Sequence, residues 1–265
     1  YISAVLRAQE KREEYVPCAE AELVSRVIRK YSSADHGKML GIIADIVESR
    51  AEEEWPEDIL ALIAQIAQMP VDKSWVDQYS SGRENSAHVL YDELFNMSQS
   101  RSIRAIARLI TTHPDLFVQY RGIISALAVS PHPFILLALS ECAVACNRIE
   151  PEYSMALFKQ LLSTDVRLLI ANHAWDFIYN DYQNDPCFYR SRLMDAIQSG
   201  YDDLEKDAAA MLCAISIYTG DEDARREIFC HHFTAELASK VCTEASYHFE
   251  DECHRDFCKE IILHM

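Results

Sequence analysis

Apolar residues recur along this chain at the spacing of amphipathic helices. Such residues at i, i+3, i+4 and i+7 share one side of a helix and can be buried together. Two examples are Leu23, Val27, Ile28 and Tyr31, and Ile59, Leu60, Ile63, Ile66 and Ala67. We find no alternating apolar and polar run bounded by Asn-Gly or Asp-Gly, the usual signature of a β-hairpin. The pattern therefore predicts an all-α fold.

Proline positions divide the chain into helices. Proline is tolerated at the first position of a helix, where its missing N–H would have no partner within the helix. Apolar runs follow the prolines at positions 56, 114, 133, 151 and 186. Pro114, Pro151 and Pro186 are 37 and 35 residues apart, which leaves room for two helices and short turns between consecutive prolines. This spacing predicts a repeated helical hairpin.

Three segments resemble one another at about the same period: 134–143, 166–175 and 204–213. We expect each to be a helix, with small residues in its second half for packing on both sides. Two-helix repeats of this length are typical of HEAT-like and tetratricopeptide solenoids. We predict a right-handed α-α superhelix of roughly seven HEAT-like hairpins. An irregular helical domain with evenly spaced loops is the alternative.

We interpret residues 1–265 as a single solenoid fragment of a larger protein. Residues 1–80 would form less regular N-terminal hairpins, 82–226 carry the best repeat match, and 227–265 would form a C-terminal cap. Polar turns followed by Ile103-Arg104 and Val166-Arg167 resemble the entry into the first helix of HEAT repeats. On that resemblance, Asp165 and Arg167 are expected to be structural residues of the kind that pair between neighbouring repeats.

Charge is distributed unevenly along the chain. The total is -17, because 42 acidic residues outnumber 25 basic ones. Negative charge repels phosphate backbones, so a general nucleic-acid binder is disfavoured. The net charge is -8 over residues 1–100, zero over 101–200 and -9 over 201–265. The neutral middle is therefore the first surface to consider for binding.

Arginines of the neutral middle form a stripe. Arg101, Arg104 and Arg108 are spaced i, i+3 and i+7, on one side of a helix, and Arg121 belongs to the next helix. Arginine is enriched at protein interfaces, so these four are candidate binding residues. Solvated charge, or pairing between repeats with Asp115, is the alternative.

Aromatic residues cluster between positions 175 and 189. Trp175, Ile178, Tyr179 and Tyr182 lie on one helical side, which is more often core than ligand site. Some of these rings could still line a concave surface, so Tyr179 and Tyr182 are also candidate binding residues.

The sequence offers little support for catalysis. It contains no Walker-type phosphate loop, Gly-x-Gly-x-x-Gly motif or Gly-x-Ser-x-Gly elbow. The C-terminal Cys and His residues, such as Cys253 and Cys258, lack the spacing of a structural zinc site. Acidic clusters at 202–207 and 221–223 depart from the Asp-Asp-x-x-Asp pattern, and acids at helix starts stabilise the helix dipole. We therefore expect no catalytic residues, no metal and no cofactor.

The chain has no apolar run of the roughly 20 residues that span a bilayer. Tyr1 is not followed by a secretory signal. Nine scattered cysteines favour reduced thiols, so we expect a cytoplasmic protein without membrane contact.

From about Gly82 to Arg226 the chain resembles the C-terminal helical-repeat region of bacterial STAND-type NTPases, including the AVAST antiviral defence group. The resemblance rests on the order of several fragments. These are Gly82-Arg-Glu-Asn-Ser86-Ala87, the turn-Val/Ile-Arg positions, Trp175-Asp-Phe-Ile-Tyr179, Tyr189-Arg-Ser-Arg192, 193–199 and Glu205-Lys-Asp-Ala208 onward to Ala214. It implies a superhelical arm that recognises a viral protein, while regions outside this fragment carry the NTPase module and oligomerise.

The sequence thus predicts a non-catalytic, protein-binding sensor. A HEAT-like scaffold unrelated to defence is the first alternative. A helical metal-dependent enzyme is the second.

Overall fold

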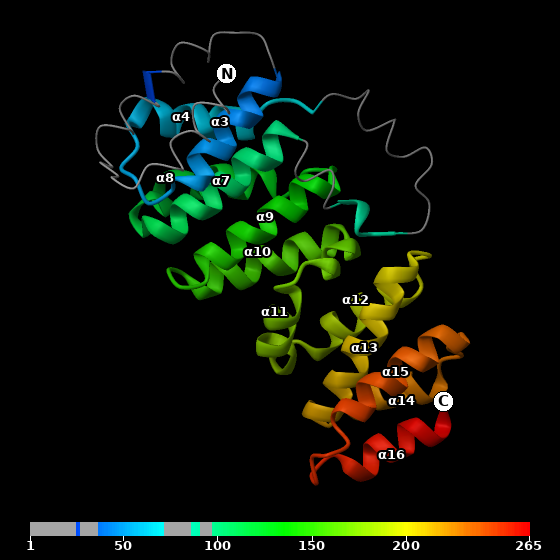
Figure 1. Ribbon diagram of the computed structural model, residues 1–265. Helices are drawn as coiled ribbons and strands as arrows, with labels where there is room; N and C mark the ends of the chain where they lie inside the picture. Colours follow the sequence, from blue (N-terminus) through cyan, green and yellow to red (C-terminus); the bar gives the residue numbers. More distant parts are fainter. Residues whose placement is uncertain (1–24, 27–36, 72–85, 91–96) are drawn as a thin grey trace, which may run out of the picture.

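The protein is a stack of helices (Figure 1). The computed structural model describes residues 25–26, 37–71, 86–90 and 97–265. Within these residues no strand occurs, which confirms the all-α prediction. Of the helix predicted around Leu23 to Tyr31, only residues 25–26 belong to this part, and they are helical; residues 82–85 of the STAND resemblance lie outside it.

The first part of the stack contains α3 (Gly37–Ser49), α4 (Glu57–Ala67), α7 (Ser98–Thr112), α8 (Phe117–Leu127), α9 (Pro133–Cys146) and α10 (Pro151–Thr164). The second part contains α11 (Ala174–Asp181), α12 (Pro186–Ile197), α13 (Asp202–Thr219), α14 (Glu222–Cys230), α15 (Ala235–Tyr247) and α16 (Arg255–His264). In the described residues, three short 3₁₀ helices lie between these: η1 (Pro114–Leu116), η2 (Val166–Ile170) and η3 (Tyr182–Asn184). No helix among these is long and apolar enough to cross a membrane.

Helices begin at the prolines as predicted. Pro133, Pro151 and Pro186 are the first residues of α9, α10 and α12, and Pro114 opens η1. Pro56 immediately precedes α4. Each proline occupies a position whose N–H has no helical acceptor, so it fixes the start of the helix without costing a hydrogen bond.

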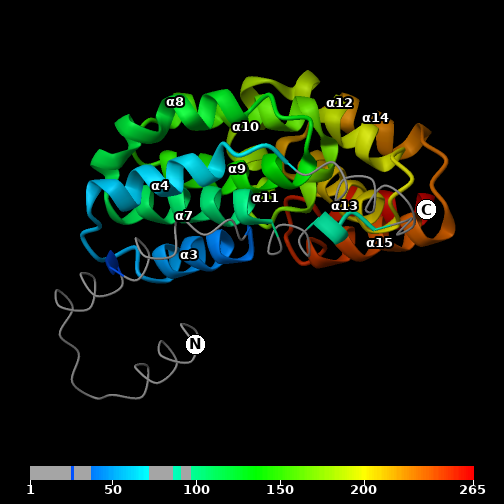
Figure 2. The same cartoon turned by 90° about the horizontal axis from the view of Figure 1, so that it is seen from above.

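Alternate helices pack in rows. In one row α3 contacts α7 and α7 contacts α9, and further along α13 contacts α15. Figure 2 shows α8, α12 and α14 along the opposite side. One hydrophobic core runs through the whole stack, from Ile43 of α3 to Ile261 of α16.

The row of α3, α7 and α9 is interrupted at residues 166–175, where a further full helix was expected. The prediction of a helix over 166–175 is wrong, because η2 ends at Ile170 and α11 begins only at Ala174. Elements α9, α10, α12 and α13 all contact η2. Leu168, Leu169 and Ile170 are therefore all buried, and an extended Ala171 ends the turn.

On the other side of the stack lie α8, α10, α12 and α14 (Figure 2). There, ion pairs join a basic residue of one helix to the acid that precedes the next of these helices. Arg121 of α8 reaches Glu150 at 2.8 Å, Lys159 of α10 reaches Asp185 at 3.4 Å, and Arg190 of α12 reaches Asp221 at 2.8 Å. Each acid immediately precedes the next helix, α10, α12 or α14. An anion at this position also stabilises the positive end of the helix dipole.

One contact connects parts of the chain that are far apart in sequence. Residues 86–90, between α4 and α7, lie at the first turn of α13 (Figure 1). The Asp203 carboxylate accepts hydrogen bonds from the Ser86 hydroxyl and from the N–H groups of Ala87 and His88, at 2.5, 2.8 and 3.0 Å. Ala87 and Leu90 are buried. Asp203 therefore ties the segment before α7 to the second part of the stack.

Candidate functional site

The arginine stripe of α7 faces two carboxylates on α3, Asp45 and Glu48, and a third, Glu52, in the turn that follows α3. Asp45, Glu48 and Glu52 have the same i, i+3, i+7 spacing as the three arginines. Arg101 Nη1 lies 2.7 Å from Asp45 Oδ2, and Arg104 Nη2 lies 2.6 Å from Glu48 Oε1. The pairs advance together along both helices, so α3 and α7 run parallel with their charges in register.

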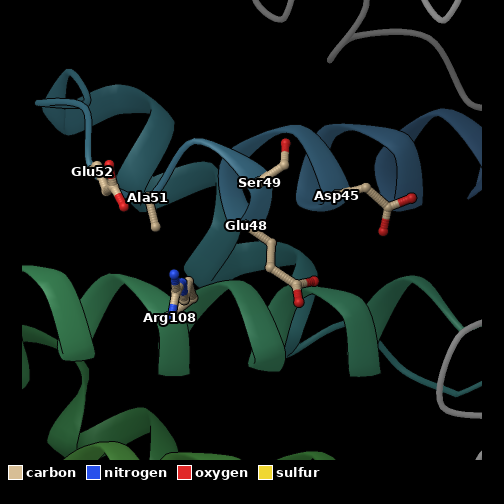
Figure 3. Close-up of a pocket in the computed structure, with 6 residues that line it drawn as sticks. All are labelled: Asp45, Glu48, Ser49, Ala51, Glu52 and Arg108. Carbon is tan, nitrogen blue, oxygen red and sulfur yellow. The ribbon is translucent and has the colours of Figure 1, made fainter.

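The third position of the stripe opens into a groove (Figure 3). Arg108 and Glu52 are both exposed. They line a cavity of about 350 Å³ together with Asp45, Glu48, Ser49 and Ala51. In Figure 3, Glu48 extends from α3 toward α7, and Arg108 lies on α7 below Ala51.

Burial changes the pKa values of two carboxyl groups in this groove. It raises the pKa of Glu48, and that effect outweighs the lowering by Arg104. The pKa of Asp45 is raised for the same reason, against the opposing charges of Arg101 and Arg104. Two of the three carboxylates of the groove, Asp45 and Glu48, are already paired with Arg101 and Arg104, and Glu52 and Arg108 are the exposed charges that remain.

Arg101 and Arg104 accordingly have the inter-helix role that the sequence left as the alternative. Their partners are residues of α3 and not Asp115. Partly buried ion pairs between helices fix packing and register, and they leave less of each guanidinium for an external ligand.

Arg121 also has partners within the molecule. Its Nη1 and Nη2 lie 2.8 and 2.9 Å from the two oxygens of Glu150. Its guanidinium lies 4.7 Å from the centre of the Tyr153 ring. The arrangement combines a bidentate carboxylate contact with a cation–π contact.

The two candidate tyrosines have different environments. Tyr179 is 52% exposed and can take part in binding. Tyr182 is only 1% exposed, and its hydroxyl donates to Asp221 at 2.8 Å. The prediction that Tyr182 is a surface binding residue is therefore wrong. The prediction assumed that Tyr182 continues the helix that contains Tyr179. Helix α11 ends at Asp181, however, and Tyr182 begins η3, where its ring is buried in the core.

Asp165 and Arg167 do pair, but within one turn. Arg167 Nη2 lies 2.6 Å from Asp165 Oδ2, and the Arg167 N–H donates to Asp165 Oδ1 at 2.9 Å. The expectation that these residues pair between neighbouring repeats is thus wrong, because they pair with each other inside one repeat. Arg167 still approaches the next hairpin, with its guanidinium 5.6 Å from the Tyr201 ring.

The Cys and His residues near the C-terminus are dispersed. Cys258 is buried, whereas Cys230 and Cys253 are exposed. His264 Nε2 lies 3.0 Å from the carbonyl oxygen of Phe229. In the part of the chain that the structure describes, no three His, Cys, Asp or Glu side chains form a set that could hold a metal ion.

Sequence reasoning missed a surface at the C-terminal ends of α13 and α15. Tyr218 is 45% exposed, and its ring lies 5.8 Å from that of Tyr179, at right angles to it. Its hydroxyl is 2.9 Å from His248 Nδ1. Tyr218 and His248 are 30 residues apart, close to one repeat, which is the only signal in the sequence that could have paired them.

The chain was compared with protein-family models, with curated proteins and with solved structures. None of the three comparisons found a match. The arguments for function therefore rest on the chain's own residues and on the resemblance described above.

Proposed function

We propose that this chain is a non-catalytic, protein-binding helical-repeat region that serves as the target-recognition arm of a bacterial STAND NTPase in antiviral defence. The observation that carries the proposal is the order of packing. From α7 onward, helices contact mainly those one or two places away in the chain, from α7 on α9 to α15 on α16. Such a stack presents a long surface relative to its core, which suits recognition of another protein.

The ion pairs of the stack also support a repeat architecture. A basic residue of α8, α10 or α12 pairs with the acid at the head of the next helix in that row. A device repeated at three successive steps favours a solenoid over an irregular helical domain.

The acidic clusters have structural roles that count against the enzyme alternative. Asp203 holds residues 86–88 through its carboxylate. Asp221 caps α14 by accepting from the N–H groups of Asp223 and Ala224, at 2.8 and 3.1 Å. Asp207 lies 3.9 Å from Lys240. These acids are distributed over separate contacts instead of converging on one ligand.

The resemblance to STAND proteins supplies the biological part of the proposal. It favours a viral protein as the partner. A HEAT-like scaffold would share the same stack, so the choice between them depends on the partner and on the parent gene. A phosphate-loop NTPase module encoded upstream would favour the STAND assignment, and its absence from the parent gene would contradict it.

Co-expression tests the partner directly. The tagged chain would be expressed with phage capsid, portal and terminase proteins, one at a time, and purified. We expect one of these proteins to co-purify in a fixed ratio that survives gel filtration. A separate phage enzyme of similar size serves as the control prey. Failure to retain any structural protein across the panel contradicts the sensor function.

A further inference from the structure

The aromatic surface at the C-terminal ends of α11, α13 and α15 is built around the exposed ring of Tyr218. Tyr179, His248 and His254 each contact that ring edge-on, with centroid distances of 5.8, 4.8 and 5.6 Å. Figure 1 places the ends of α13 and α15 at the same edge of the stack, below α11. We call Tyr179, Tyr218, His248 and His254 the aromatic edge.

Hydrogen bonds hold two rings of the aromatic edge, Tyr218 and His248, in place. The Tyr218 hydroxyl lies 2.9 Å from His248 Nδ1, and His248 Nε2 lies 3.0 Å from Glu244 Oε1. His254 Nε2 is 3.8 Å from Asp251 Oδ2. The rings of Tyr218 and His248 are thus oriented before any ligand arrives, which lowers the entropy lost on binding.

The surroundings of the aromatic edge are negative. Burial raises the pKa of Tyr218, and the charges of Glu244 and Asp251 raise it further. Helices α13 and α15 both end here, at Thr219 and Tyr247, and helix C-termini carry partial negative charge. Residues 201–265 together have a net charge of -9. A cation is therefore the complementary ligand.

The chain itself uses this combination elsewhere. Arg121 lies over the Tyr153 ring with its guanidinium held by Glu150. Lys159 lies 5.3 Å from the centre of the Tyr189 ring and 2.7 Å from Asp181 Oδ2. Among the described residues, no Lys or Arg is seen over the ring of Tyr179 or Tyr218. The aromatic edge offers the same ring and carboxylate without the cation.

We propose that the aromatic edge binds an arginine or lysine side chain from a basic segment of the partner protein, with Glu244 and Asp251 supplying the opposite charge. This inference rests on the proposed protein-binding function and names the chemistry of the partner. Exposed rings beside carboxylates bind cations through combined cation–π and ionic contacts. The same charges disfavour nucleic acid and anionic lipid.

A labelled peptide of four arginines separated by glycines tests the site directly. Its affinity for the full chain would be measured by fluorescence anisotropy. We expect Tyr179→Ala, Tyr218→Ala and Glu244→Gln each to weaken binding about three- to tenfold. The same peptide with glutamine in place of arginine should not bind. Glu152→Gln, an exposed acid of α10, removes the same charge far along the stack and should leave the affinity unchanged.

Two results would overturn the proposal. One is an equal affinity for the wild type, Tyr179→Ala and Glu244→Gln. The other is equal weakening by Glu244→Gln and Glu152→Gln with no effect of Tyr179→Ala, which would mean attraction by overall charge alone. Tyr179 is the decisive position, because its exposed side chain can be shortened with little effect on folding.

The co-expression panel separates failure of this site from failure of the proposed function. If a phage protein is captured and Tyr179→Ala captures it equally well, the aromatic edge is not the binding site but the sensor function stands. If the panel yields no partner and the arginine peptide still depends on Tyr179, the site stands and the sensor function fails.

Discussion

The two parts of the stack differ in how their charged side chains are paired. In α3 to α10, Arg101, Arg104 and Arg121 are each matched by a carboxylate on a neighbouring helix or at its head. The large apolar side chains that are exposed there, Met69, Val118, Val129 and Val144, are aliphatic, and none of them is aromatic. In α11 to α16, the exposed Tyr179 and Tyr218 contact one another beside Glu244 and Asp251, which lie next to histidines and, among the described residues, not next to a Lys or Arg. The second part has the features of a binding surface.

This difference shows why a charge count is a poor guide to a binding site. Residues 101–200 are neutral overall and rich in arginine, which drew attention to them. The acids that pair with Arg101 and Arg104 lie outside that range, in α3. A stripe of charge on one helix has to be considered together with the helix that packs against it.

The contact between residues 86–88 and Asp203 joins the two parts, and breaking it should have the largest effect. Asp203→Ala removes the acceptor of three hydrogen bonds from residues 86–88 and one from the Leu204 N–H. We expect the free energy of unfolding to fall by about 3–4 kcal/mol, since these bonds involve a charged acceptor. Urea denaturation of the purified chain measures the change.

Asp202→Ala is the control for Asp203, because Asp202 is the exposed neighbour on the same first turn. If both variants lower the free energy of unfolding equally, the loss comes only from removing a negative charge at the positive end of the α13 dipole. Residues 86–90 would then not depend on Asp203.

The second part should lose stability in acid through a buried histidine. Burial lowers the pKa of His173 to about 4 from its usual 6.5. The unfolded chain therefore takes up a proton at higher pH than the folded chain does. Stability from the neutral ring is present above pH 6.5 and is lost as the pH falls toward 4, by about 2–3 kcal/mol at 1.36 kcal/mol per pKa unit.

Unfolding curves at pH 7 and pH 4.5 for the wild type and His173→Phe measure this loss. The variant should show a smaller difference between the two pH values. Identical differences for both proteins would exclude His173 as the source of acid sensitivity.

Removing only the hydroxyl should lower the free energy of unfolding more at Tyr182 than at Tyr179. Tyr182→Phe removes a buried hydrogen bond to Asp221 and should cost about 1–2 kcal/mol of stability. Tyr179→Phe should change it by less than about 0.5 kcal/mol, since Tyr179 is exposed. Thermal denaturation of both variants tests the contrast, and a larger loss for Tyr179→Phe would reverse the assignment.

The ion pairs of α3 and α7 should give the smallest effect. A double-mutant cycle with Arg104→Ala and Glu48→Ala should yield a coupling energy of about 0.5–1 kcal/mol, because the pair is partly buried. The same cycle on the exposed residues Arg108 and Glu52 should yield about zero. Similar coupling energies for the two pairs would show that the partial burial of Arg104 and Glu48 does not strengthen their interaction.

Much of the fold follows from local rules. Pro133, Pro151 and Pro186 begin helices because of their own backbone chemistry. The helix over Ile59 to Ala67 follows from its apolar spacing, and these residues are buried as expected. The break after Ile170 could not be predicted, because the packing of α9, α10, α12 and α13 around η2 decides it.

The candidate site was only partly accessible to sequence reasoning. The spacing of Asp45, Glu48 and Glu52 matches that of the arginines and could have suggested their pairing. The meeting of Tyr179 with Tyr218 could not be inferred, since two rings 39 residues apart come together only through the packing of α11 near α13.

The sequence by itself determined that this protein is helical, where several of its helices begin and, for segments such as Ile59 to Ala67, which residues are buried. Those properties depend on apolar periodicity and on proline, which act over a few residues. The tertiary structure decided which charges are neutralised and which rings stay exposed. Exposure and pairing depend on the neighbouring helix, and no local pattern records which side chains that neighbour presents.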